Sequence, residues 1–343
     1  MQLNKNIKKL EDWNISILVF ILIGVITFAL SVNFSRDWDQ YLTQYGKIDK
    51  KSWLSHWKQI GFFSDALYLF ATKFFAGLMG YPIFTFLATV SLLTIKLRYF
   101  EKIVGVMFGG LFFYVCLYLL LLEGTASRIA FATALVVPAL YYLKQERPLL
   151  ALLLLLVGGQ IHVTVLVFLL MFPILYWQKS TALACIMLMI APLIVIIDVS
   201  IFPLVSKIIE CVNPRYMIYD GKILENQNST GLFFYFIAFF MIVISYVYYH
   251  LREEITSNRF TRTLYTLSVL AIVAMCMFHS HVAVAARLGE LLLLPMVILL
   301  SHVSMKLTHD GMVLERNTLY LVFMMYFLAR FYYLYPELVR SIL

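Results

Sequence analysis

The stretch from Glu123 to Arg128 reads EGTASR and leads directly into an apolar segment. That segment predicts a helix whose first turn contains Arg128, at the end where the helix dipole disfavours a cation. The guanidinium also adjoins hydrocarbon, where leaving it unpaired costs on the order of 3 kcal/mol. We therefore expect a compensating anion. The free N–H groups of the helix start, two nearby hydroxyls and one arginine together favour a phosphate group.

A second explanation for Arg128 stays open at this point. The side chain can pair with Glu123, or it can extend to the lipid headgroups as long cationic side chains do. The arrangement also recurs later in the chain, because we predict that Arg287 opens another apolar helix. Two such arginines favour a shared anionic ligand.

The composition indicates an integral membrane protein. Of 343 residues, 62% are hydrophobic and 13% are charged, whereas a soluble domain has about a quarter charged residues. Repeated apolar runs of roughly 17 or more residues are typical of membrane-spanning helices. No polar stretch is long enough for a separate soluble domain, so we expect an all-α fold in a single membrane domain, residues 1–343.

The charge and the motifs exclude several classes of function. The net charge of +8 favours lipid headgroups or anionic substrates as partners, and no nucleic-acid-binding motif is present. Four cysteines fit neither a disulfide framework nor a zinc site, and the sequence contains no Walker loop, GxGxxG, GxSxG or HExxH motif. We therefore expect no metal, no cofactor and no nucleic acid.

The expected topology has about eleven spans. The first helix is expected at about 15–32, and the run 61–79, which contains Asp65, Thr72 and Lys73, is expected to be an amphipathic interfacial helix or a re-entrant segment. The short basic connections, expected on the cytoplasmic side, contain Lys96, Arg98 and Lys102, then Lys144 and Arg147, then Arg252, Arg259 and Arg262. With these connections inside, the loops 33–60 and 198–230 are expected to be external. The other spans are expected at about 82–97, 103–122, 128–143, 148–158, 161–177, 181–197, 231–250, 263–279, 287–304 and 317–335.

Polar residues gather at the expected external ends of these helices. The pair Gly158-Gly159 predicts a helix break just before His162, and breaks of this kind often line substrate sites. Ionisable residues at such positions are candidate functional residues, although a single histidine can equally be a hydrogen-bonded core residue. The candidates for catalysis are His162, His281 and Glu123. The candidates for substrate binding are Arg128, Arg287, Arg215, Asp37, Asp39, Tyr216 and Glu290.

Several short motifs follow one another along the chain in a recognisable order. They are Asp37-Trp38-Asp39-Gln40-Tyr41, Gly61-Phe62, Arg128-Ile129-Ala130, Lys144 to Arg147, Gly159 to His162, and Arg287. Together they resemble the EpsG/Wzy group of bacterial polysaccharide polymerases. This sequence departs from the usual pattern at Ile129, where the family commonly has Gln, at Thr164, where it commonly has Ser, and after Arg287, where no aromatic residue follows.

The resemblance implies a GT-C-like, metal-independent glycosyltransferase in the bacterial inner membrane, with its active site facing the periplasm. Such an enzyme transfers a growing glycan from undecaprenyl pyrophosphate to a hydroxyl of the next lipid-linked repeat unit. Arg128, His162 and Arg287 are the functional residues that it implies by position. The expected partners are the lipid-linked glycans, membrane lipids, a chain-length regulator and a flippase.

The chemistry of this reaction suits the candidate residues. Guanidinium groups in a dehydrated cavity stabilise the charge that develops on a departing pyrophosphate, so we expect Arg128 and Arg287 to hold it. A histidine or one of the carboxylates is the candidate base. Two alternative functions stay open. One is a flippase or transporter of lipid-linked sugars, although no internal repeat is visible. The other is a different membrane acyl- or glycosyltransferase; the acidic pair Asp37 and Asp39 keeps open a GT-C enzyme that uses a monophosphate-linked sugar.

Overall fold

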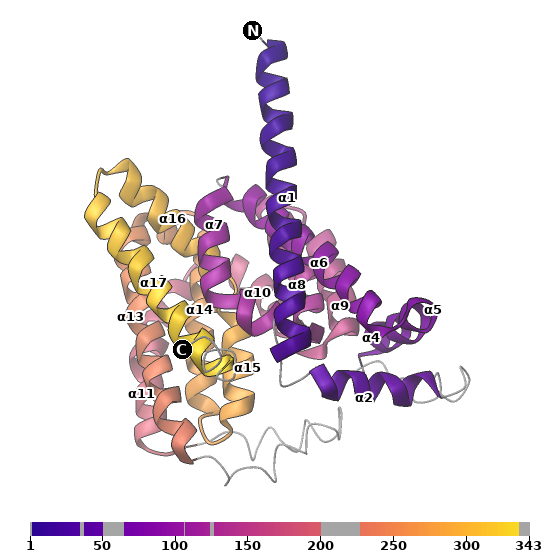
Figure 1. Cartoon of the computed structure of the whole chain (residues 1–343). Coiled ribbons are helices and arrows are strands. Elements are labelled where there is room, and N and C mark those ends of the chain that lie inside the picture. The colour runs from indigo at the N-terminus through magenta and orange to yellow at the C-terminus, as the bar shows by residue number, and fades with distance from the viewer. Residues whose placement is uncertain are drawn as a thin grey trace. The chain divides into compact units, whose positions relative to one another are not determined.

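The computed structural model of the chain describes residues 2–34, 38–50, 65–105, 107–123, 127–199 and 227–335, and every regular element in these ranges is helical (Figure 1). The elements of the N-terminal half are α1 (Gln2–Phe34), α2 (Trp38–Asp49), α4 (Ala66–Ala71), η1 (Thr72–Ala76), α5 (Gly77–Met79), α6 (Tyr81–Val104), α7 (Met107–Tyr114), η2 (Val115–Glu123), α8 (Ser127–Lys144) and α9 (Pro148–Ile161). The elements that follow are η3 (Val163–Leu170), α10 (Met171–Tyr176), α11 (Ser180–Ile196), α13 (Gln227–Ser257), α14 (Arg259–Met277), α15 (Val282–Leu292), α16 (Met296–His309) and α17 (Val313–Leu334).

The chain forms two compact units. The first unit comprises Met1–Leu166 and Leu307–Leu343, and the second comprises Val167–Lys306. Among the described residues, three helices are long and apolar enough to cross a membrane, or up to five if each of two bent helix pairs is one span. These helices support a membrane-embedded protein, while the count of eleven spans stays a prediction.

Helix α8 forms the core of the first unit. It packs between α6 and α9, α1 lies along α6, and α17 packs on η2; Figure 1 shows the N-terminal part of α1 extending beyond the other helices of this unit. Ala132, Val136 and Leu140 are fully buried, and so are Ala134, Val137 and Ala139 on other sides of the same helix. A helix that is apolar all round in this way belongs in the interior. The start of α8, with Arg128, is therefore held firmly by its neighbours.

The segment α4–η1–α5 has its polar side facing inward. Its exposed face consists of large apolar side chains, whereas Thr72 and Lys73 are buried, and the Lys73 ammonium donates to the Ile48 carbonyl oxygen at 3.0 Å. This polarity is the reverse of that of a helix on a soluble protein and suits an outer face in contact with lipid. The exposed apolar residues are Leu67, Phe70, Phe74, Phe75 and Leu78.

Two expectations about this region need correction. The stretch 33–60 is not only a loop, because α2 occupies Trp38–Asp49 within it and docks on η1. Lys96 does not lie in a connection between helices, because α6 continues to Val104 and buries that lysine completely. Sequence reasoning took charged residues as marks of a connection, but α2 contains Asp39 and Lys47, and α6 continues through Lys96.

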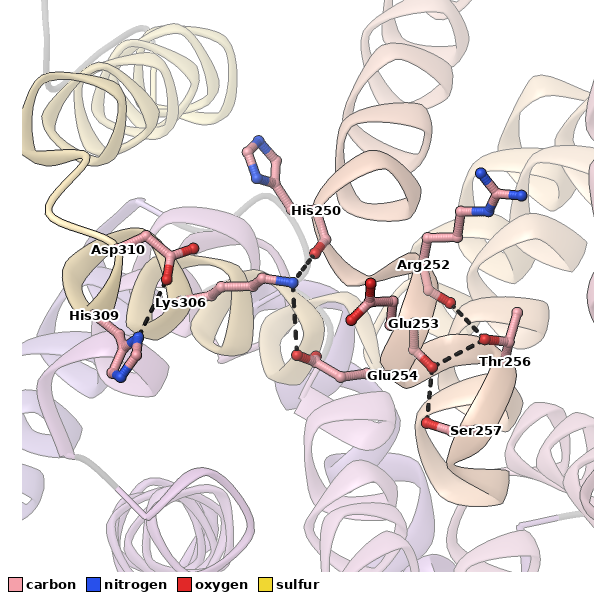
Figure 2. A network of polar contacts seen from close by, with 9 residues as sticks. All are labelled: His250, Arg252, Glu253, Glu254, Thr256, Ser257, Lys306, His309 and Asp310. Carbon is pink, nitrogen blue, oxygen red and sulfur yellow. Dashed lines mark hydrogen bonds and ion pairs between the residues drawn. The ribbon is translucent and has the colours of Figure 1, made fainter.

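Helix α14 is the central element of the second unit. It contacts α10, α11, α13 and α15. Helix α13 is kinked at Leu251, and the Lys306 ammonium donates to the His250 carbonyl oxygen at 2.7 Å beside this kink (Figure 2). The same ammonium lies 3.9 Å from the Glu254 carboxylate. A carbonyl released by a kink needs such a donor, so Lys306 stabilises the bend in α13.

Candidate functional site

Arg128 lies in the first turn of α8, as the sequence predicted, and it pairs with Asp65. The distance from Arg128 Nη1 to Asp65 Oδ2 is 3.1 Å, and the two side chains are 29% and 12% exposed. Asp65 precedes α4 and adopts a left-handed backbone conformation with φ 57°. Its carboxylate brings negative charge to the start of α8, where the helix dipole favours an anion. Arg128 therefore does not pair with Glu123, and its compensating anion comes from a residue 63 positions upstream.

Aromatic rings surround the Arg128 guanidinium. Its central carbon lies 5.5 Å from the ring centre of Tyr41 and 5.9 Å from that of Tyr68, which are distances suited to cation–π attraction. The Tyr68 hydroxyl lies 3.3 Å from that of Tyr81. Burial raises the pKa of Tyr68 well above its ordinary value, and Tyr81 adds to this rise. The phenol therefore stays protonated and remains a hydrogen-bond donor.

One N–H group of Arg128 has no partner among the described residues. Its Nε atom is buried and makes no hydrogen bond, although the guanidinium is ion-paired through Nη1. A buried donor without a partner is unfavourable unless something else accepts its hydrogen bond. The pair with Asp65 thus leaves donor capacity on Arg128 for a ligand with acceptor oxygens.

Asp65 also connects Arg128 to His162. Its Oδ1 atom accepts from the backbone N–H of Val163 at 3.4 Å, so one carboxylate lies between the start of α8 and the end of α9. His162 is the extended residue at that end, with φ −152° and ψ 117°. Asp65 therefore links Arg128 to the backbone next to His162, the two residues that the sequence singled out.

The helix break lies at His162 and not at the two glycines, which corrects the expectation. Helix α9 runs through both glycines to Ile161. A Cβ atom on Gly159 would lie 2.5 Å from a methyl carbon of Leu166, and one on Gly158 would lie 3.1 Å from a methyl carbon of Val165. The glycines therefore allow the chain after His162 to pack closely against α9.

The contacts of the His162 ring indicate which nitrogen carries its proton. Nδ1 lies 3.1 Å from the Thr164 hydroxyl and 3.4 Å from the Thr164 backbone nitrogen. A backbone N–H can only donate, so Nδ1 accepts, and the neutral ring then has its proton on Nε2. This arrangement suits a hydrogen-bond donor better than a general base.

Glu123 lies in a second buried cluster of the first unit. Its carboxylate pairs with the Lys96 ammonium and accepts from the Tyr114 hydroxyl, and the lysine is fully buried. Lys96 also donates to the Ala130 carbonyl oxygen at 3.0 Å, in the first turn of α8. Buried charges are usually paired in this way. The contacts of Glu123 are those of a residue that fixes the start of α8.

The second unit holds His281, Arg287 and Glu290. His281 is buried immediately before α15, and its Nδ1 lies 2.8 Å from the Ser280 hydroxyl. Arg287 does not open a helix, because α15 begins at Val282; the helix expected at 287–304 is in fact two, α15 and α16. The proposed likeness between Arg287 and Arg128 at helix starts is therefore wrong, while a role for Arg287 in binding stays a prediction.

The remaining candidates lie in α2 or outside the described residues. Asp39 is exposed in the first turn of α2. Asp37, Arg215 and Tyr216 lie outside the described residues. The parts of the chain that the structure describes contain no group of three or more His, Cys, Asp or Glu residues arranged to hold a metal ion.

Sequence reasoning missed Asp65 as a site residue. The available signal was a carboxylate in an otherwise apolar run, but it was interpreted only as evidence against a spanning helix. Tyr41 belongs to the motif Asp37–Tyr41 and was not singled out, and Tyr68 gave no signal among 22 tyrosines. Lys96 was assigned to a basic connection. Each of these residues acquires its role from a partner far away in the sequence.

The comparison with known families identifies one match. The model of the EpsG family matches residues 14–340, which is nearly the whole chain. The searches of curated proteins and of solved structures found no match to this chain. The family and the geometry around Arg128 are therefore the two guides to function.

Proposed function

Because the chain belongs to the EpsG family, we propose that it is a polysaccharide polymerase, a membrane glycosyltransferase that joins lipid-linked oligosaccharide repeat units. The proposed donor is a glycan on undecaprenyl pyrophosphate, and the acceptor is a sugar hydroxyl of another repeat unit. The bond between the anomeric carbon and the pyrophosphate oxygen breaks, and a bond from that carbon to the acceptor oxygen forms. The proton of the acceptor hydroxyl leaves with a base or with the pyrophosphate.

The observation that supports this proposal best is the set of contacts that Arg128 makes and the one N–H group that it leaves without a partner among the described residues. The residue is held by Asp65, flanked by two tyrosine rings and left with an unpartnered Nε–H group. Charge develops on the pyrophosphate as the glycosidic bond breaks, and fixed donors in a water-poor site stabilise it strongly. The aromatic faces and the phenol groups are well suited to the neighbouring sugar, because an aromatic ring offers apolar area together with a polar group.

In this proposal His162 donates to the substrate, while Asp65 positions Arg128. The ring of His162 already accepts through Nδ1, so its Nε2–H can donate to a phosphate or sugar oxygen. We place the site at the periplasmic face of the bacterial inner membrane, within a GT-C-like bundle of about eleven spans. The apolar helices support the membrane location, and the positive-inside pattern of the sequence supports the choice of the periplasmic side.

The proposed function is tested by deleting the gene and separating the surface polysaccharide on a gel. A polymerase deletion leaves single-repeat material, and the full-length gene restores the ladder. Complete loss of the polysaccharide would indicate a flippase or an initiating enzyme. An unchanged ladder with altered decoration would indicate a modifying transferase. Either of these results contradicts the proposal.

The role of His162 gives a first prediction. In His162→Gln the amide nitrogen takes the place of the Nε2 donor, so we expect polymer formation to stay within about tenfold of wild type. His162→Ala removes the donor and is expected to reduce polymer formation by about 10²-fold, the size of effect typical of one lost donor. The ladder in a complemented deletion strain, at matched protein levels, measures both. Equal loss in the two variants would indicate that His162 acts as a base.

A further inference from the structure

Helices α11 and α14 begin at the same end of the second unit. The two helices pack against each other, and Cys185 Sγ lies 3.8 Å from the Tyr265 hydroxyl, with both residues in the second turn of their helices. The helices are therefore parallel. Two parallel helices bring the positive ends of two dipoles close together.

A buried arginine lies at this end. Arg262 is in the first turn of α14 and is 6% exposed, and its Nε atom has no hydrogen-bond partner among the described residues. The hydroxyl oxygens of Ser180, Thr181 and Thr266 also lack partners there. The N-cap residue Asn258 accepts from two backbone N–H groups and supplies no negative charge. A cation here is opposed both by burial and by the dipole.

No carboxylate of the described residues compensates this cation. None of the described ion pairs contains Arg262. Glu254, near the end of the preceding helix, lies beside the Lys306 ammonium instead (Figure 2). An anion from outside the chain would resolve the unfavourable burial of Arg262.

A cavity of about 60 Å³ begins at Thr266, one turn of α14 beyond Arg262, which is itself not part of the lining. Thr266 lines it, and Arg262 lies one turn earlier on the same face of α14, nearer the helix start towards which helical side chains lean. Apart from Ser180 and Thr266, the residues that line the cavity are apolar. Trp177 and Lys179 are exposed near its rim, and such a pairing of Trp with Lys is typical of the lipid headgroup zone. The lining includes Ile174, Trp177, Ser180, Leu183, Ala184 and Thr266.

We propose that Arg262 binds a phosphate group, and specifically that of an anionic phospholipid whose acyl chain begins in this cavity. The guanidinium and the two helix N-termini supply the positive charge for the phosphate. The apolar lining favours a lipid headgroup over free phosphate, and basic pockets between membrane helices commonly hold such headgroups. This proposal uses none of the residues around Arg128 and does not depend on the polymerase proposal.

The experiment uses the full-length protein, purified in detergent and stripped of lipid. Binding of phosphatidylglycerol, phosphatidylcholine and inorganic phosphate is followed by native mass spectrometry and by the melting temperature. We expect added phosphatidylglycerol to bind to the lipid-free protein and to raise its melting temperature by several degrees. Phosphatidylcholine should have little effect. Arg262→Gln should weaken phosphatidylglycerol binding about tenfold, the loss of one charge-assisted contact.

Matched variants make the result specific to this site. Arg252→Gln and Arg259→Gln remove exposed arginines near the same end of α14 and should bind like wild type. In lipid-free protein Arg262→Gln should melt at the same or a higher temperature, because it removes a buried unpaired cation. Stabilisation by inorganic phosphate equal to that by phosphatidylglycerol would support the phosphate site and identify free phosphate as its ligand. Undiminished lipid binding by Arg262→Gln, or equal loss in Arg259→Gln, would overturn the proposal.

Discussion

Arg128→Ala is expected to stop chain extension, leaving single-repeat material on the gel, with polymer reduced by roughly 10²–10³-fold, as when a transition-state donor is removed. The physical reason is the loss of the guanidinium whose Nε–H has no partner within the described residues. Arg128→Lys keeps the charge but loses the planar set of donors, so we expect an intermediate reduction. Surface polysaccharide from a complemented deletion strain provides the measurement.

Two further variants control this experiment. Arg147→Ala removes an exposed arginine from the turn between α8 and α9 and should leave the ladder unchanged. Asp65→Asn retains an oxygen that can accept from Arg128 and should keep more activity than Asp65→Ala, if Asp65 acts by positioning. Long polysaccharide chains from Arg128→Ala at normal protein levels would remove this residue from the mechanism.

The largest effect on stability is expected for Lys96. Lys96→Met leaves the Glu123 carboxylate buried without its cation, and breaking a buried pair in this way costs about 3–5 kcal/mol. Replacing all three polar groups, as in Lys96→Met/Glu123→Leu/Tyr114→Phe, leaves no unpaired charge and should recover most of that loss. The melting temperature and the fraction of monodisperse protein in detergent measure the difference between the two variants.

The same triple variant separates the two possible roles of Glu123. If the residue only fixes the start of α8, the triple variant should regain both stability and a polysaccharide ladder. A stable triple variant without any ladder would instead show that Glu123 takes part in catalysis. Lys144→Met serves as the control for loss of a cation, because this lysine at the other end of α8 donates to the Ile103 carbonyl oxygen but takes part in none of the described ion pairs.

Local features of this protein were predictable because they depend on neighbours in the sequence. The apolar run after Ser127 predicted both α8 and the place of Arg128 in its first turn, and the resemblance in motifs agrees with the family match. The start of α15 was missed because the small apolar residues from Val282 to Ala286 continue the helix upstream of Arg287. The two glycines of α9 show a similar difficulty. A pair of glycines in the sequence is compatible with a break in the helix and equally with close packing of another segment against it.

The sequence by itself determined that this chain is a helical membrane protein of the EpsG family with an arginine at a helix start, since hydrophobicity, helix periodicity and motif order are local properties. Only the tertiary structure decided which charges meet. Arg128 pairs with Asp65 and Glu123 pairs with Lys96, although Glu123 and Arg128 are five positions apart. The physical reason is that ion pairing falls off over a few ångströms in space, and the packing of α4 on α9, and of α6 and α9 on α8, sets those distances.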